Sequence, residues 1–334
     1  TRTDLLRRGR ASVAIDMKHP NGIATVLRLV EQADAIIDPF RPGVTERLGL
    51  GPEECLARNP KLVYGRMTGW GQDGDLNQAA GHDLNYLALT GVLQAIGSKD
   101  LPTPPLNVVA DMGGGAMFLA VGILAGVIEA RQSGQGQVVD TAMTEGSAYL
   151  GTGAFGTLAA GEWSHERNSN TLDGGAHFYR CYKTSDGKFV SIASIEAKFY
   201  AILLDKLGLN PADLPAQMDR PTWPDMSAKF EGLFAQKSRD EWCDIMEGTD
   251  ICFAPVLTFD EAFDHPHAKS RGSFVEVDGV KQPAPAPRFS RTPSSISSPP
   301  PEYGADTAAG LSSWGMSDSE IANLMEEKAI GWQG

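Results

Sequence analysis

His82 is one of two residues in this sequence whose type and setting favour acid-base chemistry. It lies beside Asp83 in AAGHDLNYLALTG, residues 79–91, between a glycine and a run that alternates apolar and polar residues. An imidazole changes charge near neutral pH, so it can accept or donate a proton during catalysis. The ordinary alternative is a histidine that only satisfies the hydrogen bonds of its neighbours, and this stretch alone leaves both interpretations open.

Asp111 is the second candidate and lies in PPLNVVADMGGGAMFLAVG, residues 104–122. Glycines 113 to 115 and then a helical pattern follow it, so we expect its carboxylate at a helix N-terminus, where unpaired backbone N–H groups cluster. Glycines there let a ligand approach the backbone, and the N–H groups can hold an anion or a developing oxyanion. The alternative is a capping aspartate followed by glycines that serve packing.

Two further polar residues are candidates for supporting roles. Asn107 lies four residues before Asp111 and can orient the carboxylate if the segment turns. Glu196 precedes a predicted helix in SIEAKFYAILL, a position where glutamate commonly stabilises the helix N-terminus.

Basic residues gather near the start of the chain and fit a local phosphate site, since arginine and lysine pair well with phosphate oxygens. A solvated charged face is the alternative. The cluster comprises Arg2, Arg7, Arg8, Arg10, Lys18, Arg41 and Arg47.

Composition limits the classes of function. The chain has 334 residues, 42% of them hydrophobic, and a formal net charge of −13, which is typical of a folded enzyme or binding protein and disfavours a nucleic-acid platform. The longest apolar run, 116–130, is short and ends in a charge, so we expect a buried helix and no membrane span. The start of the chain lacks a signal-peptide pattern, and the C-terminal GWQG is not a peroxisomal tripeptide, so we expect a cytoplasmic protein.

Several kinds of site are disfavoured by the absence of their motifs. The four cysteines are scattered without CxxC spacing, which argues against a zinc site and a disulfide framework. The histidines lack HExxH spacing, so no metal is expected, and the GxSxG signature of a serine hydrolase does not occur.

The element pattern predicts an α/β fold followed by a smaller α+β region. Strand-like runs at 12–17, 34–40 and 61–67 alternate with a helical pattern at 21–32, which favours βαβ units and a parallel sheet. After the helix expected at 113–132, two more strand-like runs flank the turn at 185–188, and further helical patterns follow. The Pro- and Ser-rich stretch 282–304 predicts an extended connection, and a capping box at Ser317 predicts a final helix.

Several long motifs in order resemble the α-methylacyl-CoA racemases of the family III CoA-transferase fold group. They are GHDLNYLALTGVL, PLNVVADMGGGAMFLAVGIL, GQGQVVDTAM, LDGGAHFYRCY, IEAKFYAILLDKLGL and TDICFAPVLTFDEA. The resemblance runs from residue 6 to about 290 and returns in the C-terminal helix. It implies an interlocked homodimer with a large Rossmann-like CoA-binding domain at 1–180 and a small α+β domain at 181–275. An extended linker and C-terminal helix at 276–334 would return to the large domain, and a first strand of the family pattern would precede residue 1.

The resemblance also implies roles for individual residues. His82 and Asp111 would be the two acid-base groups that flank the α-carbon of an acyl-CoA thioester, with Asn107 positioning the aspartate and Glu196 orienting the histidine. Backbone N–H groups around Asp111 would hold the enolate oxygen. His177 stands where members of the family often have proline.

CoA would be part of the substrate, with no separate cofactor. The resemblance places its nucleotide near Ala14, Ile15, Asp16 and Met17 and its phosphates near Arg8 and Arg47. Pantetheine would lie along Gly81, Asp83, Leu84, Asn85 and Tyr86, with Gly113 and Gly114 also at the substrate.

Two other functions compete with a racemase. A CoA-transferase of the same fold would use Asp111 as a nucleophile and would not need His82 as a partner. A non-catalytic CoA-binding protein is the alternative of another class, although matched acid-base groups are seldom assembled without a reaction.

Overall fold

The structure is a computed structural model that describes residues 2–331 and divides the chain into two compact units. Unit 1 comprises Thr1–Ala80, Gly115–Met143 and Asp260–Gly334, and unit 2 comprises Gly81–Gly114 and Thr144–Phe259. The predicted boundaries were at 180 and 275, so residues 81–114 and 144–180, which sequence assigned to the large domain, group with the smaller one.

Unit 1 contains a three-stranded parallel sheet, as the βαβ pattern predicted. Its strands are β1 (Ala35–Asp38), β2 (Val63–Thr68) and β3 (Gln137–Ala142), with β2 in the middle. Val63 pairs with Ala35 on one side and with Gln137 on the other. The predicted helix 21–32 is confirmed as α1 (Pro20–Val30), and α2 (Val44–Arg47) and α3 (Pro52–Arg58) lie between β1 and β2 in the chain.

The predicted strand 12–17 is wrong. Its residues form a single bridge, Ile15 to Ile330, and the backbone of Ala14 and Asp16 bonds to Gly331 and Ala329. The partner segment lies at the end of the chain, about 315 residues away. A local pattern of apolar residues cannot indicate a pairing at that separation.

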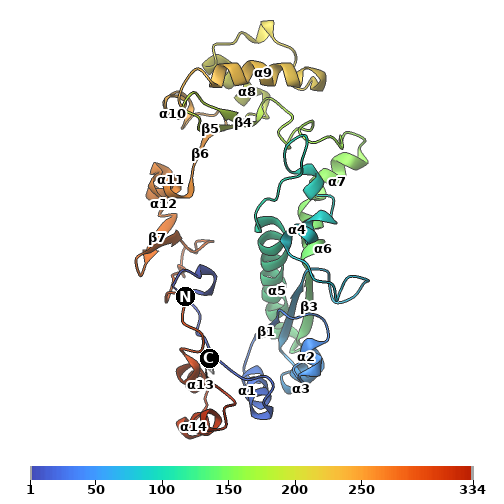
Figure 1. The fold of residues 1–334 in the computed structure, drawn as a ribbon, viewed down its shortest axis with the longest axis vertical. Coiled ribbons are helices and arrows are strands. Elements are labelled where there is room, and N and C mark those ends of the chain that lie inside the picture. Colours follow the sequence, from blue (N-terminus) through green and yellow to red (C-terminus); the bar gives the residue numbers. More distant parts are fainter. Residues whose placement is uncertain (1, 332–334) are drawn as a thin grey trace. The chain divides into compact units, whose positions relative to one another are not determined.

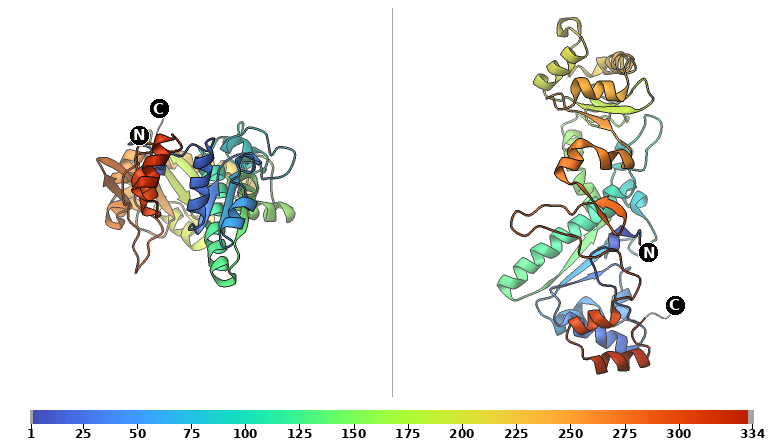
Figure 2. Two further views of the ribbon diagram at one scale, coloured as in Figure 1. Left: turned by 90° about the horizontal axis from the view of Figure 1, so that it is seen from below. Right: turned by 90° about the vertical axis from the view of Figure 1, so that its left-hand side faces the viewer.

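The longest helix packs closely on this sheet because glycines remove side chains from the contact. The π-helix η3 (Val108–Met117) leads directly into α5 (Phe118–Ser133), which lies along the parallel strands (Figures 1 and 2). A Cβ added at Gly126 would lie 3.0 Å from Val63, and one at Gly122 would lie 2.6 Å from Val139. The helical stretch begins at Val108, about five residues before the predicted start at 113. This difference exceeds the one or two residues by which helix ends are usually uncertain.

The prediction that 116–130 forms a buried helix is wrong for the single chain. Helical residues Val108–Ser133 form one stretch of 26 residues that is long and apolar enough to cross a membrane by composition, and only 22% of its most apolar window is buried. The exposed side chains recur at helical spacing on one face: Met117 (62%), Val121 (63%), Leu124 (64%) and Ile128 (60%). This apolar stripe has no partner within the described part of the chain.

The rest of unit 1 comes from the two chain ends. The 3-10 helix η1 (Leu5–Arg7) lies near the start, and α11 (Phe259–Asp264), α12 (Pro266–Arg271) and the hairpin β7 (Phe274–Val277) and β8 (Val280–Pro283) follow unit 2. The predicted extended connection is confirmed, since no helix or strand lies between β8 and α13 (Thr307–Ser313). The last helix, α14 (Asp318–Glu326), begins at the predicted capping box of Ser317 and Glu320.

Unit 2 contains an antiparallel sheet covered by helices. The strands β4 (Tyr179–Lys183), β5 (Phe189–Ala193) and β6 (Phe253–Val256) pair in that order, and the predicted turn joins β4 to β5 with Gly187 at φ +78°. The helical elements of this region are α8 (Ala197–Lys206), η4 (Pro211–Asp213), η5 (Arg220–Thr222), α9 (Trp223–Phe234) and α10 (Arg239–Met246). Fully buried Phe178, Tyr182, Phe230 and Phe234 pack between the sheet and these helices.

The remaining elements of unit 2 include η3, which carries Asp111, and α4, which begins directly after His82. They are α4 (Asp83–Ala88), η2 (Leu93–Ala95), α6 (Met143–Leu150), α7 (Thr152–Ala159) and the first part of η3.

Candidate active site

One buried carboxylate links the segments that carry His82 and Asp111. Asp83 is only 5% exposed, and its Oδ2 accepts hydrogen bonds from the backbone N–H groups of Ala110 (2.9 Å) and Asp111 (2.7 Å). Because His82 precedes Asp83 in the chain, this contact joins the start of α4 to the first turn of η3. The structure thereby brings together the backbones of the two predicted acid-base residues within a single unit.

Asn107 contacts Asp111 as predicted. Its side-chain amide donates to Asp111 Oδ2 at 3.4 Å, and the backbone N–H of Met112 donates to the Asn107 carbonyl at 3.3 Å. Leu106 has a positive φ of 59°, so the chain turns sharply just before Asn107. This turn places the amide against the carboxylate four residues later, and the positioning role itself stays a prediction.

His82 occupies the position that precedes the first residue of α4. Its backbone is extended, and its N–H donates to the Asn85 side chain at 3.1 Å, which fixes the entry of the chain into the helix. The Tyr86 hydroxyl donates to the carbonyl of Gly81. The residues predicted to lie along pantetheine therefore stabilise this turn, and of them Leu84 has an exposed side chain while those of Asp83 and Tyr86 are buried.

The structure gives no support to the prediction that N–H groups around Asp111 hold the enolate oxygen, because the three nearest ones are already bonded within the chain. The N–H groups of Ala110 and Asp111 are both bonded to Asp83, and that of Met112 is bonded to Asn107. Sequence could not show this, because the acceptor lies 27 and 28 residues away in the chain.

The glycines after Asp111 serve close packing, which was the alternative interpretation of these residues, and their contact with substrate stays a prediction. A Cβ added at Gly114 would lie 2.6 Å from the backbone N of Ser147, and one at Gly146 would lie 1.9 Å from the carbonyl oxygen of Gly114. A Cβ at Gly113 would lie 3.0 Å from Leu150. The absence of side chains at these glycines lets η3 and α6 approach closely. Gly114 is buried in this contact and is not open to a ligand.

Glu196 lies outside this group of contacts. It is exposed at the residue before α8 and makes no side-chain capping bond there. Across residues 2–331 no hydrogen bond joins it to His82, so its predicted orienting role has no support from contacts within one chain.

The residues predicted to bind the nucleotide and phosphates all belong to unit 1. Arg8 donates to the Gln282 side chain at 2.7 Å, and Arg47 is exposed in the last turn of α2. The backbone of Ala14 is bonded to Thr307 and Gly331.

Ile15 packs in the small apolar cluster of the C-terminal helices, and the side chain of Asp16 accepts from the N–H of Lys18. Met17 is partly buried. Thus segment 14–17 is ordered by the C-terminal segment, and the contact of these residues with CoA stays a prediction.

No group of three or more His, Cys, Asp or Glu side chains in the described residues is arranged to hold a metal ion.

His177 lies in the core of unit 2 and not with His82. It is 1% exposed, and its Nε2 lies 2.8 Å from the Tyr200 hydroxyl. Burial lowers the pKa of His177 to about 4, which keeps its imidazole neutral.

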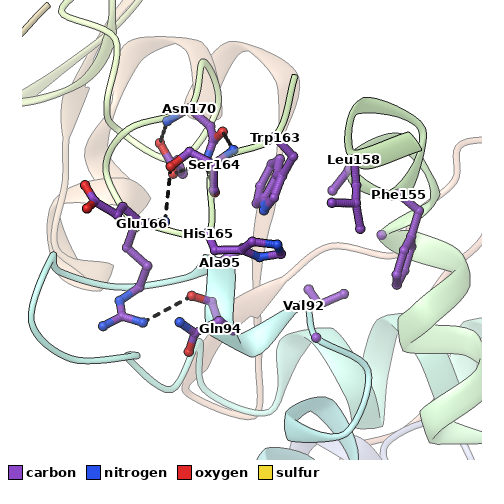
Figure 3. Close-up of a pocket in the computed structure, with 15 residues that line it drawn as sticks. Val92, Gln94, Ala95, Phe155, Leu158, Trp163, Ser164, His165, Glu166 and Asn170 are labelled. Atoms are coloured by element: carbon purple, nitrogen blue, oxygen red, sulfur yellow. Dashed lines mark hydrogen bonds between the residues drawn. The ribbon is translucent and has the colours of Figure 1, made fainter. Parts of the chain in front are cut away.

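Unit 2 also contains a cavity of about 200 Å³ that sequence reasoning did not find. Figure 3 shows the side chains of Val92, Phe155, Leu158 and Trp163 around the cavity, with the imidazole of His165 pointing in between Trp163 and Val92. The lining residues come from two distant stretches, 91–95 and 151–173, so no local pattern indicated it.

Comparisons with known proteins identify the family. A family model described as CoA-transferase family III matches residues 3–307. A solved structure of a CAIB/BAIF family protein from Brucella suis superposes with a TM-score of 0.78 at 25% identity, covering 92% of this chain and 82% of that chain. The chain belongs to CoA-transferase family III.

Within that family, the chain is similar over nearly its full length to proteins named alpha-methylacyl-CoA racemase. The mouse (Mus musculus) protein is 46% identical over 334 residues, which cover 99% of this chain and 87% of the relative. The human (Homo sapiens) protein is 44% identical over 328 residues, which cover 97% and 86%.

Proposed function

We propose that this protein is a racemase that interconverts the (R) and (S) forms of 2-methylacyl-CoA thioesters. The observation that carries the proposal is the link that Asp83 makes between His82 and Asp111, in a chain 46% identical to the mouse racemase. An acyl-CoA substrate is in keeping with the family, and no separate cofactor is required for proton transfer.

The reaction needs two acid-base groups on opposite sides of one carbon. One group removes the α-proton, the electrons of the C–H bond move into an enolate, and the thioester oxygen gains negative charge. The other group then delivers a proton to the opposite face. In this proposal His82 and Asp111 exchange these roles according to the enantiomer, and Asn107 holds the Asp111 carboxylate in place.

The enolate oxygen requires a hydrogen-bond donor. The N–H groups at the start of η3 are occupied by Asp83, whereas the first N–H groups of a helix have no partner inside that helix. In this proposal the backbone N–H groups of Asp83 and Leu84, at the start of α4 directly after His82, supply the donors, since that of Asn85 is bonded to the His82 carbonyl.

A CoA-transferase that uses Asp111 as its nucleophile is the second candidate, because transferases give the family its name. The two functions predict different products. A racemase exchanges the α-proton with solvent and needs no acceptor acid, whereas a transferase moves CoA to a free carboxylate and leaves the α-proton in place.

The test is incubation of the protein with each enantiomer of 2-methylbutyryl-CoA in deuterated water. We expect deuterium at the α-carbon and loss of configuration without an added acid. The variants His82→Ala and Asp111→Ala should each lose exchange on one enantiomer, and on opposite ones, while CoA affinity stays unchanged. CoA transfer without exchange would establish the transferase, and CoA binding without either reaction would establish a non-catalytic protein.

A homodimer forms part of the proposal, because the apolar stripe of α5 is exposed in the single chain. Four large apolar side chains on one helix face are costly to leave in water, and a second copy with the same stripe can cover them. A partner chain is also the source from which Glu196 could reach His82.

A further inference from the structure

Arg66 is a buried arginine that lies between two carboxylates of unit 1. Its side chain belongs to β2, and the residue is only 7% exposed. The Nη1 group donates to Glu46 Oε1 at 2.8 Å, and Nη2 lies 3.4 Å from Asp38 Oδ2. Asp38 is the last residue of β1 and Glu46 belongs to α2, so one guanidinium links the two ends of segment 38–46.

Stability alone is a weak explanation for this arginine. In the part of the chain that the structure describes, its Nε and Nη2 groups are buried and make no hydrogen bond. Burying incompletely bonded nitrogens costs free energy, and an interior ion pair is often no more stable than apolar residues of the same volume. A cation at this position therefore calls for a functional explanation.

The segment that Arg66 links carries two cations that are open to solvent, Arg41 and Arg47. Across residues 2–331 no carboxylate forms an ion pair with either of them. Arg41 donates to the carbonyl of Gln78 at 3.3 Å. The Arg47 guanidinium lies against Gly43, because a Cβ added there would be 3.1 Å from its Nη1. Both arginines therefore lie along the turn that leads from β1 into α2.

This turn is well placed to bind an anion. It leaves the carboxyl end of β1 in a parallel sheet, and ligands of open α/β sheets bind outside the carboxyl ends of the strands. Arginine pairs well with phosphate oxygens. In a chain with a formal net charge of −13, an anion needs local cations that neighbouring carboxylates do not cancel. Asp38 and Glu46 flank the turn, and Arg66 balances part of their charge from inside the fold.

We infer that Arg66 is a positioning residue for binding of the CoA phosphates: by holding Asp38 and Glu46, it keeps Arg41 and Arg47 available to phosphate oxygens. The inference rests on the proposed function, in which CoA is part of the substrate. Arg66 is buried and acts through the two carboxylates without touching CoA. In its absence the exposed Glu46 would turn to the arginines of the loop, and both carboxylates would repel phosphate.

The experiment measures binding of CoA to the full chain by calorimetry. Arg66→Gln should weaken CoA binding by about tenfold. The double variant Arg66→Gln/Glu46→Gln removes a carboxylate together with the cation and should bind CoA within about threefold of the unmodified protein. Arg239→Gln is the matched control, because Arg239 is an equally buried arginine of unit 2 that donates to the carbonyl of Val256. It should lose stability and keep its affinity for CoA.

A substrate without phosphates separates this role from a merely structural one. The 2-methylbutyryl thioester of pantetheine lacks the nucleotide and its phosphates. Arg66→Gln should lower kcat/KM for 2-methylbutyryl-CoA by about tenfold and for the pantetheine thioester by less than about twofold. Equal losses on the two thioesters would overturn the inference, as would a double variant that binds CoA no better than Arg66→Gln.

If Arg66→Gln does not fold, Arg66→Lys takes its place, because lysine keeps the charge. A single ammonium cannot bridge both carboxylates as the planar guanidinium does, so CoA affinity should fall by about threefold and Glu46→Gln should restore it. Unchanged affinity in Arg66→Lys would overturn the inference. Absence of proton exchange, with CoA affinity still responding to these variants, would overturn the racemase and leave the role of Arg66 standing.

Discussion

Replacing Asp83 by alanine tests whether one carboxylate sets the geometry between His82 and Asp111. Two hydrogen bonds to the charged group are lost, at 2.9 and 2.7 Å, and each is worth about 1.5 to 3 kcal/mol. Alanine also removes a buried charge whose Oδ1 has no hydrogen-bond partner, which returns part of that energy. We expect a net loss of about 2 to 4 kcal/mol in the free energy of unfolding.

The effect on catalysis should exceed the effect on binding. Without Asp83, the first turn of η3 is no longer tied to α4, so Asp111 can move relative to His82, and a displacement of about 1 Å can cost on the order of a hundredfold in rate. We expect kcat to fall by about that factor and KM to change little. Asp83→Asn keeps an acceptor oxygen for the two N–H groups and should recover most of the activity.

The assay combines urea denaturation with steady-state exchange kinetics on 2-methylbutyryl-CoA. Asp173→Ala is the matched control, because Asp173 accepts from the N–H groups of Ser169, Asn170 and Gly175 in its own loop. It should lose stability without a comparable loss of kcat for this short substrate. A destabilised Asp83→Ala protein with unchanged kcat would refute the positioning role.

Three further predictions concern other parts of the chain. Burial lowers the pKa of His177 to about 4 from an ordinary value of 6.5, so as pH falls the unfolded state binds this proton before the folded state does. The free energy of unfolding should therefore fall by on the order of 3 kcal/mol as pH decreases from 6.5 to 4. His177→Phe should flatten this part of a plot of unfolding free energy against pH, and an unchanged slope would contradict the assignment. Arg66→Ala should lower the free energy of unfolding by about 3 to 5 kcal/mol, because buried Asp38 loses its cation 3.4 Å away, and a urea midpoint equal to that of the unmodified protein would contradict this. Leu124→Lys on the exposed stripe of α5 should weaken the proposed homodimer in sedimentation experiments, and a dimer of unchanged affinity would place the interface elsewhere.

Local patterns predicted much of the secondary structure. The strands β1 and β2, the helix α1, the β4–β5 turn and the capped final helix all follow from signals within a few residues, such as alternation, helical spacing and a Ser–Glu capping box. Segment 12–17 was the exception, since its apolar residues suited a strand but its backbone bonds to the far end of the chain.

The chemistry of the site was readable because His82, Asn107 and Asp111 have side chains whose types alone suggest proton transfer and its support. The CoA contacts of unit 1 and the cytoplasmic location are still predictions. The residue types could not show which contacts Asp83 and the glycines after Asp111 make in the folded chain.

The sequence by itself determined the family and the candidate acid-base pair, because both depend on which residues occur in which order. Only the tertiary structure decided that Asp83 is a buried link, that Gly114 serves packing and that an apolar cavity lies between 91–95 and 151–173. These features arise between residues that are tens of positions apart. Hydrogen bonding, close packing and cavity shape depend on distances in space, which periodicity along the chain does not encode.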